Sequence, residues 1–239
     1  TNQSALKELS GPFDEDEEAI RKVIQPYWGK TPVLIRKAFD DDDSGYWPTW
    51  KDIVSLSCDQ EIGAASARLI RHTPGNLESF DLELGPFDDT KHRNGKQKWT
   101  ILLNDVDRYM PELAEWMDQR FGFLPRWRRD DAQVSIAGVG GGIGPHVDNY
   151  DVFLIQAAGS RQWYVDPRPL NAVKERENLI PNISVSILRL DEDNDANNQV
   201  TLHKGDMLYL PPRCVHWGTA TTDDCMTLSV GCRAPSAAE

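Results

Sequence analysis

The chain contains 239 residues, of which 39% are hydrophobic, and it carries a formal net charge of -12 at pH 7. This length is enough for one domain of barrel size or for two small domains. The acidic balance argues against direct binding of nucleic acid, because phosphate backbones are bound by basic surfaces. A basic protein or peptide partner would suit the negative field, although solubility alone explains the charge equally well.

No feature of the sequence predicts a membrane segment or a secreted protein. No apolar run approaches the roughly 20 residues of a membrane-spanning helix, and the N-terminus, TNQSALKELSGPFDEDEEAI, lacks the basic and then apolar layout of a signal peptide. The cysteines have no CxxC spacing, which predicts free thiols in a reducing compartment; they are Cys58, Cys214, Cys225 and Cys232. We therefore expect a soluble protein of the cytoplasm, or of a chloroplast or mitochondrion.

The N-terminal part predicts a helix and then a strand. Residues 14–25, DEDEEAIRKVIQ, predict a short helix with an acidic start that ends at Pro26, so residues 1–27 are expected to form a helical lead-in. Residues 28–39 contain a strand, and the four aspartates at 40–43 predict a solvated loop.

The next segments predict three strands and the longest helix. Two strands are expected at residues 66–72 and 79–87, joined by the turn-forming sequence TPGN. A strand at 99–103 is followed by apolar side chains at helical spacing, with Asn104 or Asp105 able to cap the helix. This helix is expected to bury a stripe formed by Val106, Tyr109, Met110, Leu113, Trp116 and Met117.

From Gln133 onward the sequence is nearly all strand-like. The expected strands cover residues 133–139, 152–158, 162–166, 183–190, 200–212 and 225–232, and an acidic loop covers residues 191–199. Many short strands at regular spacing, with the helices confined to the N-terminal half, predict a mainly β protein of the α+β class. Its core would be a β-barrel or a two-sheet jelly roll, the double-stranded β-helix of the cupins.

The stretch GPHVDNYDVFLIQ places His146 and Asp148 two residues apart at the head of an apolar run. In a strand such residues point to the same face, so an imidazole and a carboxylate could share one point in space. The glycines of GVGGGIG upstream allow a tight backbone approach. Following the strand in GDMLYLPPRCVHWG, His216 could supply a third group. Two histidines and one carboxylate form the facial triad of non-haem Fe(II) oxygenases, whereas zinc more often recruits cysteine or a third histidine.

The remaining histidines suit such a site less well. His203 is expected on the surface of a strand, and His72 and His92, in turn-rich polar sequence, are expected to face solvent. For His146 and Asp148, the alternative is a buried histidine–carboxylate hydrogen bond without a metal.

A co-substrate with carboxylates would need a fixed cation near the metal. Arg161 lies in the turn AAGSRQW that opens the next strand. A guanidinium there could hold a carboxylate through charge-assisted hydrogen bonds that contribute about 1.5–3 kcal/mol each. The alternative is a surface arginine at a hairpin.

Several longer stretches carry a family resemblance. PHVDNYDVFLIQAAGSRQWYV, GDMLYLPPRCVHWG and LSVGCRAPS together resemble the Jumonji-C family of Fe(II)- and 2-oxoglutarate-dependent oxygenases, specifically its ribosomal oxygenases of the bacterial arginine-hydroxylase type. WGKTPVLIRKAF, SARLI, LGPF and WTILLNDVD are similar to the N-terminal half of that family. The resemblance therefore predicts a catalytic domain over residues 28–235.

The resemblance implies Fe(II) as cofactor, with 2-oxoglutarate and dioxygen as co-substrates. It makes His146, Asp148 and His216 the iron ligands, and it places Arg161 where the family binds the distal carboxylate of 2-oxoglutarate. No separate catalytic acid or base is required.

One position departs from the family pattern. Ala137 stands where a small hydroxyl residue is expected near the 2-oxoglutarate carboxylate, so Ser135 or Ser229 is a candidate to supply the missing hydrogen bond. Beyond the catalytic domain, the family continues into a dimerisation region and a winged-helix domain. The four residues at 236–239 are expected to form only a tail, so the sequence does not predict whether the chain forms a homodimer.

The substrate implied by the resemblance is an arginyl residue of ribosomal protein sixteen of the large subunit. A basic ribosomal protein is electrostatically compatible with an acidic enzyme. A histidyl hydroxylase and a non-oxygenase metal-binding cupin, such as an isomerase or a binding module, remain as alternatives. The cation at Arg161 favours an oxygenase, but the sequence identifies no substrate-binding residue, and in particular no carboxylate that would select arginine.

Overall fold

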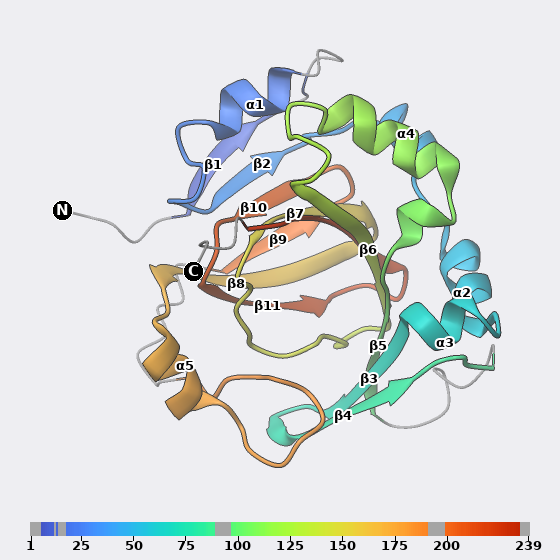
Figure 1. Cartoon of the computed structure of the whole chain (residues 1–239). Helices are drawn as coiled ribbons and strands as arrows, with labels where there is room; N and C mark the ends of the chain where they lie inside the picture. Colours follow the sequence, from blue (N-terminus) through green and yellow to red (C-terminus); the bar gives the residue numbers. More distant parts are fainter. Residues whose placement is uncertain (1–5, 12, 14–17, 89–96, 191–198, 235–239) are drawn as a thin grey trace.

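The computed structural model describes residues 6–11, 13, 18–88, 97–190 and 199–234, and its strands form two sheets (Figure 1). The nine-stranded sheet runs in the order β1 (Lys7–Ser10), β2 (Val33–Arg36), β10 (Met207–Leu210), β7 (Asp151–Ala158), β12 (Cys225–Cys232), β6 (Arg129–Ala137), β5 (Lys98–Leu103), β3 (Ala67–Thr73) and β4 (Asn76–Leu84). The three-stranded sheet consists of β11 (Cys214–Ala220), β8 (Ser160–Pro169) and β9 (Gln199–His203). Apart from the parallel pair β1–β2, the paired strands of both sheets are antiparallel.

Helices lie along the outer side of the large sheet, as Figure 1 shows for α1, α2 and α4. The helical segments are α1 (Glu18–Ile24), the 3-10 turn η1 (Asp43–Tyr46), α2 (Trp50–Cys58), α3 (Ile62–Ser66), the 3-10 turn η3 (Val106–Arg108), α4 (Pro111–Arg120) and α5 (Ala172–Asn178). The buried hydrophobic side chains of α1, α2, η3 and α4 join one core cluster with the outer face of the sheet. Within the described residues, no helix is both long and apolar enough to cross a membrane.

The two faces of the large sheet follow from the two-residue period of its strands. In β7, Phe153 and Ile155 belong to the outer core, whereas Val152 and Leu154 pack between the two sheets. Both faces are covered, which explains why this strand reads as a continuous apolar run. The inner face, opposite β8 and β11, is where the chain can build a cavity.

This architecture confirms the expected fold class, a mainly β double-stranded β-helix with N-terminal helices and extra strands. The segment expected to be a purely helical lead-in also contributes β1, which lengthens the large sheet through its pairing with β2. The sequence did not indicate α2, α3, α5 or β11. The starting residues of the first predicted helix, residues 191–198 of the predicted acidic loop and the tail at 236–239 lie outside the described residues.

Three predicted elements differ in detail. The strand expected at 200–212 is divided into β9 and β10, which belong to different sheets. The helix expected around 106–117 is split into η3 and α4, because Pro111 starts a new helix at its first turn. Asp105 precedes η3 but its side chain makes no capping hydrogen bond. Residues 183–190 are not a strand: Leu188 makes only an isolated bridge with Leu179. In this segment hydrophobic residues pack against β3–β5 without ladder pairing, which the alternation of the sequence could not reveal.

The aspartate run at 40–43 is not simply a solvated loop. Asp43 is only 4% exposed, and its Oδ1 accepts hydrogen bonds from Trp116 Nε1 and Arg120 Nε, both at 2.7 Å. This carboxylate joins η1 to α4 beneath the helical layer. The sequence could not predict the burial of Asp43, because the three aspartates that precede it are the same residue type and are exposed.

Replacing Asp43 with alanine should destabilise the protein by about 1–3 kcal/mol, because the buried Trp116 Nε1 would lose its acceptor. The free energy of unfolding in urea measures this effect. Asp41→Ala is the matched control, since Asp41 is 93% exposed and pairs with Lys204 at the surface. Equal unfolding midpoints for the two variants would contradict the structural role of Asp43.

Candidate metal centre and cavity

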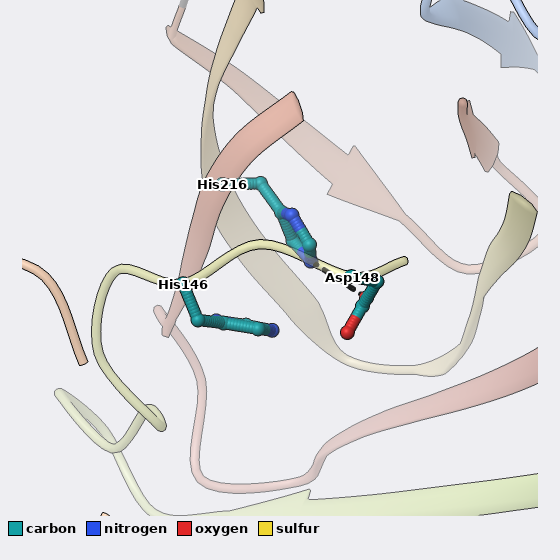
Figure 2. A group of neighbouring side chains, drawn as sticks. All are labelled: His146, Asp148 and His216. Atoms are coloured by element: carbon teal, nitrogen blue, oxygen red, sulfur yellow. Dashed lines mark ion pairs between the residues drawn. The ribbon is translucent and has the colours of Figure 1, made fainter. Parts of the chain in front are cut away.

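Three side chains predicted to share one point in space do converge. His146, Asp148 and His216 each offer a ligand atom, and these atoms lie within 4.8 Å of one another. Figure 2 shows both imidazoles and the carboxylate directed to a common centre, with His216 Nε2 at 3.5 Å from Asp148 Oδ2. Among the described residues, this is the only cluster of at least three histidine, cysteine or acidic side chains with such spacing.

The backbone achieves this convergence without the regular strand expected for His146 and Asp148. Both lie between β6 and β7, where His146 forms an isolated bridge with His216 of β11. The backbones of His146 and His216 exchange two hydrogen bonds, of 3.1 and 3.0 Å. Gly144 has a φ of +83°, a left-handed conformation that favours glycine, and so turns the chain immediately before the site. His216 was expected to follow a strand, but it lies within one, β11.

Hydrogen bonds orient both imidazole rings. Nδ1 of His146 lies 2.9 Å from the carbonyl oxygen of Gly144, and Nδ1 of His216 lies 3.0 Å from that of Cys214. Because a carbonyl oxygen can only accept, each Nδ1 donates, and each Nε2 is the nitrogen left for a ligand. This is the arrangement by which outer partners orient histidine ligands of metals.

The electrostatics of the cluster favour neutral imidazole. Burial and the neighbouring His146 lower the pKa of His216 to about 4, although the carboxylate of Asp148 partly opposes this change. His216 is therefore neutral at physiological pH, the form that metal binding requires. Two imidazoles and one carboxylate match the donor set of non-haem Fe(II) sites, so these residues fit such an ion.

The other histidines lie elsewhere. His203 is exposed on β9, as expected. His72 was expected to face solvent, but it is half-buried and its ring stacks on Phe80 with centroids 4.4 Å apart. It does not belong to the metal-site cluster, and His92 lies outside the described residues.

A cavity of about 430 Å³ opens beside the cluster, between the two sheets. Arg161 of β8 lines it and is only 3% exposed. Its Nη2 is buried without a hydrogen-bond partner among the described residues, while its guanidinium lies 5.7 Å from the ring of Trp163. A buried cation with an unsatisfied donor is costly unless an anion completes it. The surface-arginine alternative is therefore wrong for Arg161.

Both candidate serines line the same cavity, together with polar residues that the sequence analysis missed. Ser135 of β6 pairs with Thr227 of β12, and Gln133 pairs with Ser229. The signal was present as alternation: in DAQVSIA, Asp131, Gln133 and Ser135 face the cavity while the intervening Ala132, Val134 and Ile136 face the outer core.

Charged and phenolic groups complete the cavity wall. Burial raises the pKa of Asp131, and the neighbouring aspartates add to this effect, although the backbone N–H of Asp105 opposes it. Burial and the charge of Asp148 also raise the pKa of Tyr150, whose side chain is 38% exposed. Apart from Asp148, Asp131 is the only carboxylate among the described residues that line this cavity.

Comparison with known proteins places this site in a family. A protein-family model described as the JmjC domain matches residues 117–239, just over half of the chain. The chain belongs to the JmjC family. The match covers all three residues of the cluster and Arg161.

Several relatives of this JmjC chain have been described. It is 33% identical over 213 residues to a probable ribosomal oxygenase of Haemophilus influenzae, covering 89% of this chain and 49% of the relative. It is 32% identical over 216 residues to the ribosomal protein uL16 3-hydroxylase of Escherichia coli, covering 90% and 53%. The chain thus spans about half the length of these curated relatives.

Solved structures agree with this assignment of the fold. The structure of YcfD, a ribosomal oxygenase from Escherichia coli, in complex with cobalt and 2-oxoglutarate, matches with a TM-score of 0.70 and 31% identity over 91% of this chain and 52% of that chain. Another YcfD crystal structure matches with a TM-score of 0.71 and 30% identity. The JmjC double-stranded β-helix is therefore supported by sequence and by structure.

Proposed function

We propose that this protein is an Fe(II)- and 2-oxoglutarate-dependent protein hydroxylase that acts on an arginyl residue of ribosomal protein uL16. The observation that carries the proposal is the joint presence, in one cavity, of a two-histidine, one-carboxylate cluster and a buried arginine with an unsatisfied donor. The relative from Escherichia coli that is named uL16 3-hydroxylase supports the choice of substrate.

Each residue of the cavity then has a defined task. His146, Asp148 and His216 would hold Fe(II), which supplies the redox chemistry that couples decarboxylation of 2-oxoglutarate to hydroxylation of a C–H bond. Arg161 would bind the distal carboxylate of 2-oxoglutarate and so orient the molecule. No side chain is required as a general acid or base.

The two cavity serines would assist this binding. Ser135 and Ser229 stand on adjacent strands of the inner face, where their hydroxyl groups can donate to a carboxylate. Thr227 lies beside them, and its hydroxyl donates to Gln156 Oε1 at 3.2 Å. The assignment of either serine to 2-oxoglutarate stays a proposal, as do homodimer formation and the cellular compartment.

Asp131 is the carboxylate that we propose for recognition of the arginyl side chain. Its raised pKa reflects burial beside other aspartates, and a bound guanidinium would relieve both costs. The formal charge of -12 also suits a basic substrate, mainly by speeding association.

Asp131→Asn should therefore raise KM for a uL16 peptide at least about tenfold, because a charge-assisted hydrogen bond would be replaced by a neutral one. KM for 2-oxoglutarate should stay unchanged. Steady-state kinetics with each substrate varied in turn measure both constants. Asp130→Asn is the control, since Asp130 pairs with Arg233 at the surface. A peptide KM equal to that of the wild type would remove Asp131 from substrate recognition.

Succinate formation from 2-oxoglutarate, followed with mass spectrometry of a uL16 peptide, tests the function itself. We expect Fe(II)-dependent succinate and a gain of one oxygen atom on arginine. The same gain on histidine would instead support a histidyl hydroxylase. Succinate without peptide modification would retain the oxygenase and discard the substrate. Folded, iron-loaded protein that gave neither signal would favour the non-oxygenase cupin.

A further inference from the structure

The thiol of Cys225 lies directly against the cation of the cavity. Cys225 is fully buried at the start of β12 and is a free cysteine. Its Sγ accepts a hydrogen bond from Arg161 Nε at 3.3 Å and another from Gln156 Nε2 at 3.5 Å. This contact joins β12 to β8, and so the large sheet to the small one.

The rest of the Arg161 side chain is closely confined. Its guanidinium lies beside the Trp163 ring, and its methylene stem passes Gly218 of β11. A Cβ added at Gly218 would come within 2.7 Å of Arg161 Cδ and 3.0 Å of the Trp163 ring. The stem therefore has little freedom to translate, but these apolar contacts do not fix the rotation of the guanidinium plane.

The thiol supplies that missing constraint. A guanidinium offers either Nε with Nη2 or the terminal pair, Nη1 with Nη2, to a bidentate carboxylate. Because Nε of Arg161 already donates to Cys225 Sγ, the terminal pair is left for the ligand, and Nη2 is the atom buried without a partner.

The sulfur is itself held in place. The Gln156 amide that donates to it also donates to the carbonyl oxygen of Ala158 at 2.8 Å, and its Oε1 accepts from the Thr227 hydroxyl. Cys225 packs with Ala137 and Ala220, whose small side chains leave room for sulfur. Ala137 is the position at which a hydroxyl group was expected, and here its cross-strand partner Cys225 supplies a polar atom next to Arg161.

We propose that Cys225 is a positioning residue, which turns the Arg161 guanidinium so that its terminal nitrogens face the distal carboxylate of 2-oxoglutarate. This inference rests on the proposed function of the cavity. It predicts that Cys225 affects affinity for acids that carry the distal carboxylate, without affecting the metal centre.

The test is equilibrium binding measured by calorimetry with Fe(II) under nitrogen, where no turnover occurs. Cys225→Ala should raise Kd for 2-oxoglutarate about three- to tenfold, the range expected for loss of one hydrogen bond. Kd for 2-oxobutyrate, which lacks the distal carboxylate, should change less than about twofold. In air, KM for 2-oxoglutarate should rise while kcat at saturation stays within about twofold. Cys225→Ser keeps a smaller acceptor and should recover part of the affinity.

Cys232→Ala is the matched control, because Cys232 is a fully buried thiol on the same strand that faces the outer core. Both dissociation constants should equal those of the wild type. Unchanged 2-oxoglutarate binding in Cys225→Ala, or an equal loss for both acids, would overturn the positioning role. If the alanine variant does not fold, the ratio of the two constants in Cys225→Ser decides the question. Wild-type protein that binds neither acid would instead refute the proposed function.

Discussion

His146→Ala is expected to reduce Fe(II)-dependent succinate formation at least about a hundredfold. Changes to residues that only orient metal ligands already cost 10- to 100-fold in affinity or activity, so loss of a ligand should cost no less. The remaining imidazole and carboxylate would leave an incomplete donor set. Metal content after gel filtration, measured by inductively coupled plasma mass spectrometry, should fall together with activity.

His203→Ala provides the control for this substitution. It removes another imidazole, but from an exposed position on β9 outside the cluster. Iron content and turnover should match those of the wild type. If His146→Ala retained full iron content and turnover while remaining folded, the assignment of the metal centre would be wrong.

Arg161→Ala is expected to raise KM for 2-oxoglutarate about a hundredfold or more. Two charge-assisted hydrogen bonds of about 1.5–3 kcal/mol each would be lost from a site that is almost fully buried. Arg161→Lys should rescue little of this loss, because a single ammonium cannot reproduce the planar fork. Initial rates over a wide range of 2-oxoglutarate concentrations measure the effect.

Arg168→Ala is the comparison on the same strand. Arg168 lies at the exposed end of β8, where it pairs with Asp166, and its loss should leave the 2-oxoglutarate dependence unaltered. A 2-oxoglutarate KM for Arg161→Ala close to the wild-type value would show that another group binds the distal carboxylate.

The sequence predicted the convergence of the metal cluster for a reason that was only partly right. Residues two apart in a strand share a face, but His146 and Asp148 lie outside regular strands. Their side chains converge because the backbone of His146 pairs with that of His216, a long-range contact that no local pattern encodes. The residue types were enough to predict a metal site, but the convergence of the side chains depends on the tertiary pairing.

The cavity wall shows which properties local patterns can reveal. Alternation along β6 and β12 identifies a polar inner face, but it does not reveal which polar atom meets Arg161. Cys225 escaped notice because a cysteine without a partner motif reads as a small apolar residue. Asp43 was mistaken for a surface residue for a similar reason, since its partners Trp116 and Arg120 lie on a distant helix.

The side chains around the cavity differ in how exposed they are, and this difference bears on the order in which the substrates bind. Arg161 and His216 are each 3% exposed, His146 and Asp148 are partly exposed, and Tyr150 is 38% exposed. A polypeptide seated against Tyr150 and Asp131 would cover the route to Arg161. The small acid would then have to enter before the polypeptide and leave after it, which imposes a compulsory order of addition. A bound polypeptide substrate would thereby close the cavity during the reaction.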